Sequence, residues 1–299
     1  MSSIVVRRGG GPEVLQLEEV DDPVPGEGEV LVRLEAAAVN HFDLTQRRDP
    51  AAAGTPVPYT PGLDGAGTRV DTGERVLVTG TLGTYAELIA APGENVWPIP
   101  DSLDTPRAAA LGVAYKTAWA SLAAAELQRG ETLLVQAGSS GTGQAAIDIG
   151  RFLGATVYAT ASESKHDRLR ELAAEPLDYD DPRIAELGAA VVFDPVGGSV
   201  FERSLAALAP GGRLVTPGAV ESSIVSLNLW PLIFKGLRIF GTGAGSVTRE
   251  DFARVIDLAG NGDLAPVVGR ELPLADAAEA HRLIEAREVF GKIVLRTSA

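Results

Sequence analysis

A glycine-rich segment in the second half of the chain has residue types suited to binding a phosphate. The segment reads Ala137-Gly138-Ser139-Ser140-Gly141-Thr142-Gly143 and directly follows an apolar run that begins at Leu133. A strand that turns on glycines into a helix points free backbone N–H groups and the positive end of the helix dipole at one spot, which suits a pyrophosphate. The spacing is G-x-x-G-x-G rather than G-x-G-x-x-G, so a tight strand-to-helix turn without a ligand is the alternative.

The elements around this turn alternate between short apolar runs and helix-like segments. The runs begin at Leu133, Thr156, Ala189, Arg213 and Leu237, and the helical segments lie near 143–153, 164–174, 198–208 and 228–235. Such an alternation predicts a parallel, doubly wound α/β sheet of the Rossmann type. Because the glycine-rich turn opens the first strand–helix unit of that sheet, the context favours dinucleotide binding over an empty turn.

The residues after the next run decide between the two nicotinamide cofactors. In such sheets, an acidic residue at this strand end binds a ribose hydroxyl, whereas basic and small polar residues accept a 2′-phosphate. Here Ser162, Lys165 and Arg168 follow the run, whereas Glu163, directly after Ser162, argues for a ribose hydroxyl instead. Charge-assisted contacts from these side chains favour NADPH over NADH. The alternative is that Lys165 and Arg168 form the solvated face of a helix.

The first hundred residues have a different, mostly β pattern. Val30–Ala36 and Arg75–Thr79 are β-rich runs separated by prolines and glycines, and a polar stretch at 40–47 predicts a short helix. The C-terminal end adds a helix near 276–286 and a strand that begins at Lys292. This region therefore predicts a second domain of another architecture.

Composition restricts the classes of function. The 299 residues correspond to about two domains. A net charge of −14 argues against nucleic acid or an anionic membrane as a partner. The chain has no cysteine, and its three histidines, His41, His166 and His281, lie far apart in sequence. Disulfides and thiolate-bound zinc are thereby excluded, and we expect no metal site. The first residues carry charges and glycines instead of an apolar run, so we expect a cytoplasmic protein.

Several segments together, in their order along the chain, resemble a known family. They are Gly11-Pro12-Glu13-Val14-Leu15, Ala38-Val39-Asn40-His41-Phe42-Asp43 with Arg47, Pro58 to Gly67, Gly83-Thr84-Tyr85-Ala86-Glu87, Thr117-Ala118, Phe193 to Gly198 and Gly291-Lys292-Ile293-Val294-Leu295. With the glycine-rich turn, these segments resemble the zinc-independent, zeta-crystallin-like quinone oxidoreductase branch of the medium-chain dehydrogenase/reductase superfamily. Zinc-dependent relatives carry a histidine within the segment that corresponds to Gly62-Leu63-Asp64, and this chain has none there.

The resemblance implies a fold, a cofactor and an assembly. It implies a partly open, mostly β barrel of the GroES-like type, formed by residues 1–111 and 264–299. A Rossmann domain at 112–263 is inserted between these two parts, and NADPH binds in the cleft. It also implies a homodimer and a small quinone or carbonyl substrate.

The resemblance and the residue chemistry together indicate candidate site residues. Candidate catalytic residues are Asn40, Tyr59 and Thr117. Candidate cofactor-binding residues are Asn40, Thr117, Ser140, Gly141, Thr142, Gly143, Ser162, Lys165, Arg168, Tyr179, Gly218, Ala219, Gly243 and Lys292. Relatives place their phosphate-binding lysine one residue further along, where this chain has His166.

Several of these candidates have a structural alternative. Asn40 could cap a loop, Tyr59 could serve packing, and Lys292 could be an edge-strand charge. Asp43 and Arg47 lie four residues apart, which suits an ion pair within a helix.

These residues predict a zinc-free, NADPH-dependent oxidoreductase. Hydride that arrives at one end of a quinone or an α,β-unsaturated carbonyl pushes negative charge onto the distant oxygen, where a few placed donors stabilise it. One alternative is an enoyl-thioester reductase of a polyketide or fatty-acid pathway. Another is a non-catalytic NADPH-binding protein with a structural or sensor role.

Overall fold

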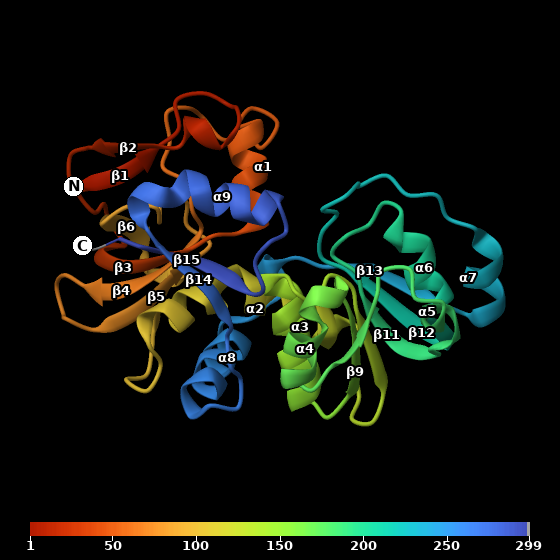
Figure 1. Cartoon of the computed structure of the whole chain (residues 1–299). Coiled ribbons are helices and arrows are strands. Elements are labelled where there is room, and N and C mark those ends of the chain that lie inside the picture. The colour runs from red at the N-terminus through yellow and green to blue at the C-terminus, as the bar shows by residue number, and fades with distance from the viewer. Residues whose placement is uncertain (298–299) are drawn as a thin grey trace. The chain divides into compact units, whose positions relative to one another are not determined.

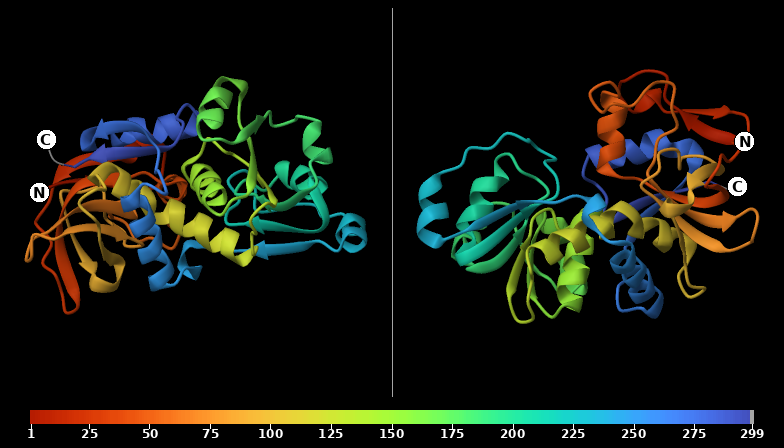
Figure 2. Two further views of the ribbon diagram at one scale, coloured as in Figure 1. Left: turned by 90° about the horizontal axis from the view of Figure 1, so that it is seen from below. Right: turned by 180° about the vertical axis from the view of Figure 1, so that it is seen from behind.

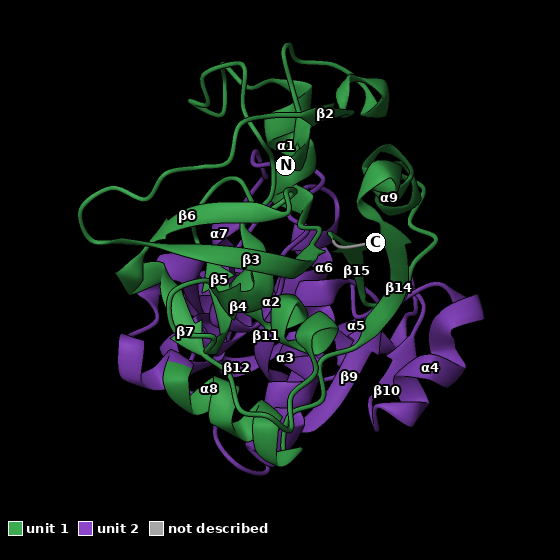
Figure 3. Ribbon diagram, turned by 90° about the vertical axis from the view of Figure 1, so that its left-hand side faces the viewer, with its two compact units in different colours: residues 1–113, 253–299 green, residues 114–252 purple. Residues whose placement is uncertain are grey.

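The computed structural model describes residues 1–297, which divide into two compact units (Figure 3). Unit 1 comprises Met1–Val113 together with the chain from Ala253 onward, and unit 2 comprises Ala114–Phe252. Each unit has its own sheet, so the two are described separately.

Unit 2 contains a six-stranded sheet in which every strand pair is parallel. The strand order is β10-β9-β8-β11-β12-β13. The strands are β8 (Thr132–Val135), β9 (Thr156–Thr160), β10 (Glu175–Leu177), β11 (Ala189–Phe193), β12 (Leu208–Thr216) and β13 (Arg238–Gly241). This is the predicted Rossmann-like, doubly wound sheet.

Helices cover both faces of this sheet (Figure 1). They are α3 (Gly141–Phe152), α4 (His166–Glu171), α5 (Arg183–Glu186), α6 (Val200–Ala206) and α7 (Leu229–Lys235). On one face, α5 and α6 pack side chains such as Ile184 and Phe201 against Leu134 and Val192 of the strands. On the other face, α3 lies so close that its Gly150 faces Leu133 and Val157. Burial of both faces explains why the strands are almost continuously apolar.

Unit 1 is built mainly from antiparallel strands, with β14 and β15 as a parallel pair, and has the predicted GroES-like, mostly β character. Its larger sheet has the order β14-β15-β3-β4-β5-β7, and β6 pairs with β3. The strands are β1 (Ser2–Val5), β2 (Gln16–Glu19), β3 (Glu29–Ala38), β4 (Asp64–Arg69), β5 (Arg75–Thr79), β6 (Leu88–Pro92), β7 (Val96–Pro98), β14 (Val268–Pro273) and β15 (Lys292–Arg296). The C-terminal strand β15 thus lies inside the N-terminal sheet, between β14 and β3.

Four longer helices complete the chain: α1 (His41–Arg48), α2 (Thr105–Ala124), α8 (Arg249–Asn261) and α9 (Ala277–Glu285). The views of Figure 2 show α1 beside α9, and buried side chains of both helices join one apolar cluster with Ile4 and Tyr85. The helix α2 bends at Gly112, whose backbone is not helical. No helix within residues 1–297 is long and apolar enough to cross a membrane.

Candidate active site

The glycine-rich turn of unit 2 joins β8 to α3 and has the geometry of an anion cradle. Ser140 caps α3, and its Oγ accepts the N–H of Gly143 at 3.0 Å. A Cβ on Gly143 would overlap the carbonyl of Ala137, and one on Gly138 would lie 2.7 Å from the Cβ of Ala159. Only glycine permits this close turn. Apart from the Gly143 N–H, which Ser140 accepts, the first N–H groups of α3 have no acceptor within the helix, which makes them available to a phosphate.

A chain of buried hydrogen bonds fixes the strand ends below this turn. The Thr160 hydroxyl accepts the N–H of Ala137 at 3.1 Å and donates to Gln136 Oε1 at 2.7 Å. Gln136 Nε2 donates to the Ser204 hydroxyl, which donates to Asp194 Oδ2 at 2.9 Å. These bonds link the carboxyl ends of β8, β9 and β11. Gln136, Thr160 and Ser204 were not predicted from the sequence, although Gln136 and Thr160 are polar residues at the ends of apolar strands, which is a usable signal; Ser204 lies on α6 and has no such signal.

The three predicted 2′-phosphate residues occupy different environments. Lys165 Nζ lies 3.4 Å from Ser139 Oγ, so its ammonium faces the glycine-rich turn. The hydroxyl of Ser162 is exposed and lies 3.4 Å from that of Ser164. Arg168 is half-exposed, and its Nε lies 3.8 Å from the carboxylate of Glu171. His166, which stands where relatives have their lysine, places Nε2 3.2 Å from the carbonyl of Ala161.

The remaining candidates of unit 2 also lie near the carboxyl ends of its strands. The backbone carbonyl of Thr117, on α2, accepts a hydrogen bond from the Ser121 hydroxyl, whose Oγ also lies 2.7 Å from the hydroxyl of Thr242, beside Gly243. Tyr179 follows β10, and Gly218 and Ala219 follow β12. Because all six strands are parallel, these loops share one edge of the sheet, which is where open α/β sheets bind ligands.

In unit 1, the carboxamide of Asn40 is held from both sides. Asn40 Nδ2 donates to Asp64 Oδ2 at 2.8 Å, and Oδ1 accepts a hydrogen bond from Lys292 Nζ at 2.6 Å. Lys292 also donates to the carbonyl of Val39 at 2.7 Å. It is buried on an interior strand, so the alternative of an edge-strand charge is wrong. Asn40 does cap α1, but its side chain bonds to Asp64 and Lys292.

Asp64 is itself anchored by three further bonds. Its Oδ1 accepts the hydroxyl of Thr79 at 2.8 Å, and both oxygens accept the N–H of Val113 at 3.0 Å. The bend of α2 at Gly112 brings this N–H to the carboxylate, and a Cβ on Gly112 would overlap Asp64. The side chain that faces Asn40 is therefore rigid.

A second buried polar chain connects α1 with α9. Arg47 NH1 lies 3.3 Å from His281 Nδ1, His281 Nε2 lies 3.2 Å from Tyr85 Oη, and Tyr85 donates to Asp43 Oδ2 at 2.9 Å. Arginine can only donate, so Nδ1 is the acceptor and Nε2 carries the imidazole proton. Asp43 and Arg47 are thus connected through His281 and Tyr85, and the expected direct ion pair is replaced by Arg47–Glu285 at 2.6 Å.

Burial controls the protonation of this chain. Burial lowers the pKa of His281 to about 3, with the charge of Arg47 acting in the same direction, so the imidazole is neutral. Burial raises the pKa of Asp43 to about 7, although hydrogen bonds from the Asn40 N–H and from Tyr85 oppose the shift. From the sequence, His281 is only a potential metal ligand, and its place in this polar chain was not predicted.

Tyr59 lies in the core of unit 1 with its hydroxyl unused. It is 8% exposed, and its hydroxyl has no hydrogen-bond partner within residues 1–297. Burial, together with the charge of Asp43, raises its pKa to about 12, so the phenol stays protonated. It therefore retains a proton that it could donate.

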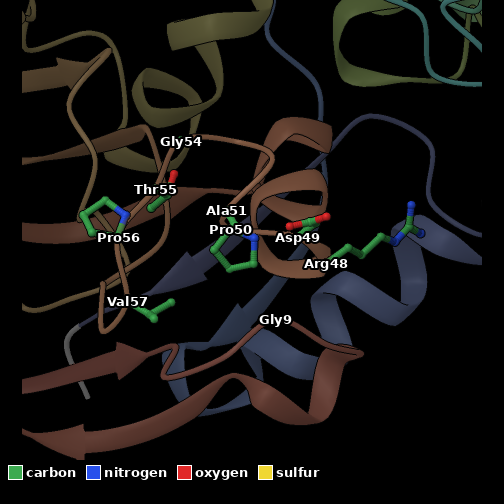
Figure 4. Close-up of a pocket in the computed structure, with 9 residues that line it drawn as sticks. All are labelled: Gly9, Arg48, Asp49, Pro50, Ala51, Gly54, Thr55, Pro56 and Val57. Carbon is green, nitrogen blue, oxygen red and sulfur yellow. The ribbon is translucent and has the colours of Figure 1, made fainter.

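Next to this region, unit 1 contains an open cavity of about 590 Å³ (Figure 4). The side chain of Arg48 extends to α9, where it donates to Glu285 at 3.0 Å. The lining residues are Gly9, Arg48, Asp49, Pro50, Ala51, Gly54, Thr55, Pro56 and Val57. Within residues 1–297, no group of three or more His, Asp or Glu side chains is placed to hold a metal ion.

Comparisons with known proteins match both parts of the chain. Residues 26–101 match the alcohol dehydrogenase GroES-like domain, and residues 173–295 match a zinc-binding dehydrogenase domain. Quinone oxidoreductase of Sus scrofa is 32% identical over an alignment that covers 99% of this chain and 97% of that protein.

Solved structures agree with these matches. An NAD-dependent alcohol dehydrogenase is 34% identical with a TM-score of 0.92, covering 100% of both chains. A mycobacterial protein solved in complex with NADPH is 30% identical with a TM-score of 0.90, covering 99% of this chain and 100% of that chain. The resemblance read from the sequence is confirmed: the chain belongs to the medium-chain dehydrogenase/reductase superfamily, in the branch of the quinone oxidoreductases.

Proposed function

We propose that this chain is a zinc-free, NADPH-dependent oxidoreductase that transfers hydride to a quinone or an α,β-unsaturated carbonyl. One observation carries the proposal: at the carboxyl edge of the unit 2 sheet, the Lys165 ammonium faces the glycine-rich turn. The cradle of Ser140, Gly141, Thr142 and Gly143 fits a pyrophosphate, and Lys165 with Ser162 and Arg168 fits a 2′-phosphate. A relative of similar fold was solved with NADPH, which supports the same cofactor here.

Bound NADPH supplies the hydride, and the protein orients it and stabilises the charge that develops on the substrate oxygen. In this proposal, Asn40 and Thr117 contact the nicotinamide end, and Tyr59 donates to the substrate oxygen. Tyr179, Gly218, Ala219 and Gly243 contact the remainder of the cofactor. The residue types support a mechanism without zinc, because the chain lacks cysteine and has no histidine in the segment Gly62-Leu63-Asp64, where zinc-dependent relatives carry one.

We also propose a cytoplasmic homodimer. Among residues 1–297, the strand β13 ends the unit 2 sheet and pairs with β12 alone, which leaves one edge open to another chain. Near it, Leu229, Trp230, Ile233 and Phe234 of α7 are all more than half exposed. An apolar surface of this kind favours association.

Stopped-flow oxidation of NADPH against a panel of quinones, enones and enoyl thioesters tests the reaction. We expect turnover with quinones or enones, undiminished by strong chelators. Turnover with enoyl thioesters alone would identify the carrier-bound alternative, and no hydride transfer to any acceptor would indicate a non-catalytic binder. Loss of activity that added zinc restores would contradict the zinc-free mechanism.

The substitution Lys165→Ala tests the cofactor assignment. We expect it to weaken NADPH binding by roughly 10- to 100-fold, which corresponds to one charge-assisted hydrogen bond, and to affect NADH binding much less. Fluorescence titration with both cofactors measures the two dissociation constants. Arg170→Ala is the matched control, because this exposed arginine of α4 pairs with Asp167. Equal losses for NADPH and NADH would remove Lys165 from the 2′-phosphate site.

A further inference from the structure

The carboxamide of Asn40 is the one proposed catalytic group of unit 1 whose orientation the protein specifies completely. An asparagine side chain presents an acceptor on one side and two donors on the other, and a rotation of 180° exchanges them. Here the acceptor Oδ1 faces the ammonium of Lys292, which can only donate. The donor Nδ2 faces the carboxylate of Asp64, which accepts. The flipped orientation would place donor against donor and acceptor against acceptor.

The strand register brings these partners together. The strands β15 and β3 are antiparallel with Val294 opposite Ala38, and continuing that register places Lys292 opposite Asn40. On the other side of β3, Asp64 pairs directly with Ala38. Asn40 thus lies just beyond the end of β3, between side chains from the two neighbouring strands. A clamp of this kind is built into the sheet and needs no ligand to form.

The two sides of the clamp differ in how they are held. Asp64 is fixed by Thr79 and Val113 in addition to Asn40. The contacts of Lys292 are to the backbone carbonyl of Val39 and to Asn40 itself. Loss of Asp64 would therefore disturb several elements, whereas loss of the Lys292 ammonium removes mainly the partner of the carboxamide oxygen.

We propose that Lys292 is a positioning residue, whose ammonium holds the Asn40 carboxamide in one orientation for the hydride transfer proposed above. It acts through Asn40 and not by touching the cofactor or the substrate. This inference replaces the expectation that Lys292 binds the cofactor, because its ammonium is buried and bonded to Val39 and Asn40. It rests on the proposed function.

A double-mutant cycle with Lys292→Met and Asn40→Ala tests the proposal. We expect each single substitution to lower kcat by roughly 10- to 100-fold, as for a misplaced catalytic group, with a smaller change in KM for NADPH. The double variant should be no slower than Asn40→Ala, because Lys292 acts only through Asn40. If the two losses in kcat multiply in the double variant, Lys292 has a role independent of Asn40 and the proposal is wrong.

Lys292→Met also removes the counter-charge of Asp64 and Asp43, so a second variant separates positioning from charge balance. Lys292→Met combined with Asp43→Asn, measured at pH 8, removes one charge of each sign and leaves the Asp64 side of the clamp unchanged, because the amide oxygen at position 43 still accepts from the Asn40 N–H and Tyr85. We expect it to regain thermal stability without regaining kcat. Recovery of kcat would show that Lys292 only balances charge. Lys235→Met is the matched control, because Lys235 Nζ also donates to two backbone carbonyls, those of Ala206 and Leu208.

A readout that does not need turnover keeps this inference separate from the proposed function. If the wild-type protein does not oxidise NADPH in the presence of any acceptor of the panel, the proposed function is wrong. The same cycle is then measured by the free energy of unfolding in urea. A coupling between Lys292→Met and Asn40→Ala that differs from zero supports the clamp, and strict additivity contradicts it.

Discussion

At the scale of single residues, Asp43 makes stability depend on pH in an unusual direction. Burial raises its pKa to about 7, whereas the unfolded chain has an ordinary aspartate. The folded state therefore binds the proton more tightly, so this contribution to stability is complete below about pH 4 and is lost as the pH rises through 7. The loss is on the order of 4 kcal/mol as an upper bound.

The substitution Asp43→Asn tests this dependence. The amide keeps an oxygen that accepts from the Asn40 N–H and Tyr85, but it has no proton to lose. We expect the melting temperature of the variant to gain on that of the wild type between pH 4 and pH 8. Asp101→Asn, at an exposed position, is the control. A difference in melting temperature between wild type and Asp43→Asn that stays constant over this range would contradict the assignment.

The sequence predicted individual site residues better than it predicted their partners. Asn40, Asp43 and Lys292 stand in recognisable local segments, and each of them lies in the polar networks of unit 1. His281 had no such signal, because its partners Arg47 and Tyr85 are about 200 residues away in the chain. The same reason explains the wrong expectation for Asp43 and Arg47. Helical spacing allows a direct ion pair between Asp43 and Arg47. In the folded protein, however, the His281 imidazole and the Tyr85 phenol connect the two side chains.

At the scale of elements, the bend of α2 is a requirement of the site. Gly112 interrupts the helix at the point where the N–H of Val113 meets Asp64. We expect Gly112→Ala to destabilise the protein by about 2 kcal/mol or more, because the added Cβ overlaps a carboxylate that Thr79 and Asn40 hold in place. Denaturant unfolding measures the loss.

A matched glycine provides the control for this substitution. Gly245 has open space around the position of a Cβ and no positive φ, so Gly245→Ala should change the free energy of unfolding by only a few tenths of a kcal/mol. Equal stability of Gly112→Ala and wild type would mean that the bend is not set by contact with Asp64.

Helices and strands with a strong hydrophobic periodicity were predicted from the sequence, and those with a weak periodicity were missed. The runs at Leu133, Thr156 and Ala189 are apolar because both faces of their sheet are buried, and each is a strand. The strand β14 (Val268–Pro273) was missed, since it is an edge strand whose residues are mostly exposed and do not alternate between apolar and polar. Hydrogen bonding to β15 holds this segment as a strand, although its own sequence lacks a strand pattern.

At the scale of the whole molecule, the pairing of chain ends could not be derived from local patterns. The strand β15 enters the N-terminal sheet beside β3, a contact between segments more than 250 residues apart. Periodicity indicates only that both are strands. The resemblance to a known family, based on the order of motifs along the chain, predicted that the N-terminal part and the C-terminal tail form one domain.

The proposed homodimer depends on the exposed apolar side chains of α7. The side chains of Trp230 and Phe234 stack at 5.4 Å between ring centroids, and they are 64% and 79% exposed. We expect Phe234→Glu to convert the dimer to a monomer, because a charge in an apolar interface loses its hydration without gaining a partner. Light scattering coupled to gel filtration gives the mass. Val24→Glu is the control, since Val24 is 88% exposed and belongs to unit 1, whereas the proposed surface belongs to unit 2. A wild-type protein that stays monomeric at high micromolar concentration, or a Phe234→Glu dimer as tight as the wild type, would exclude this surface as the interface.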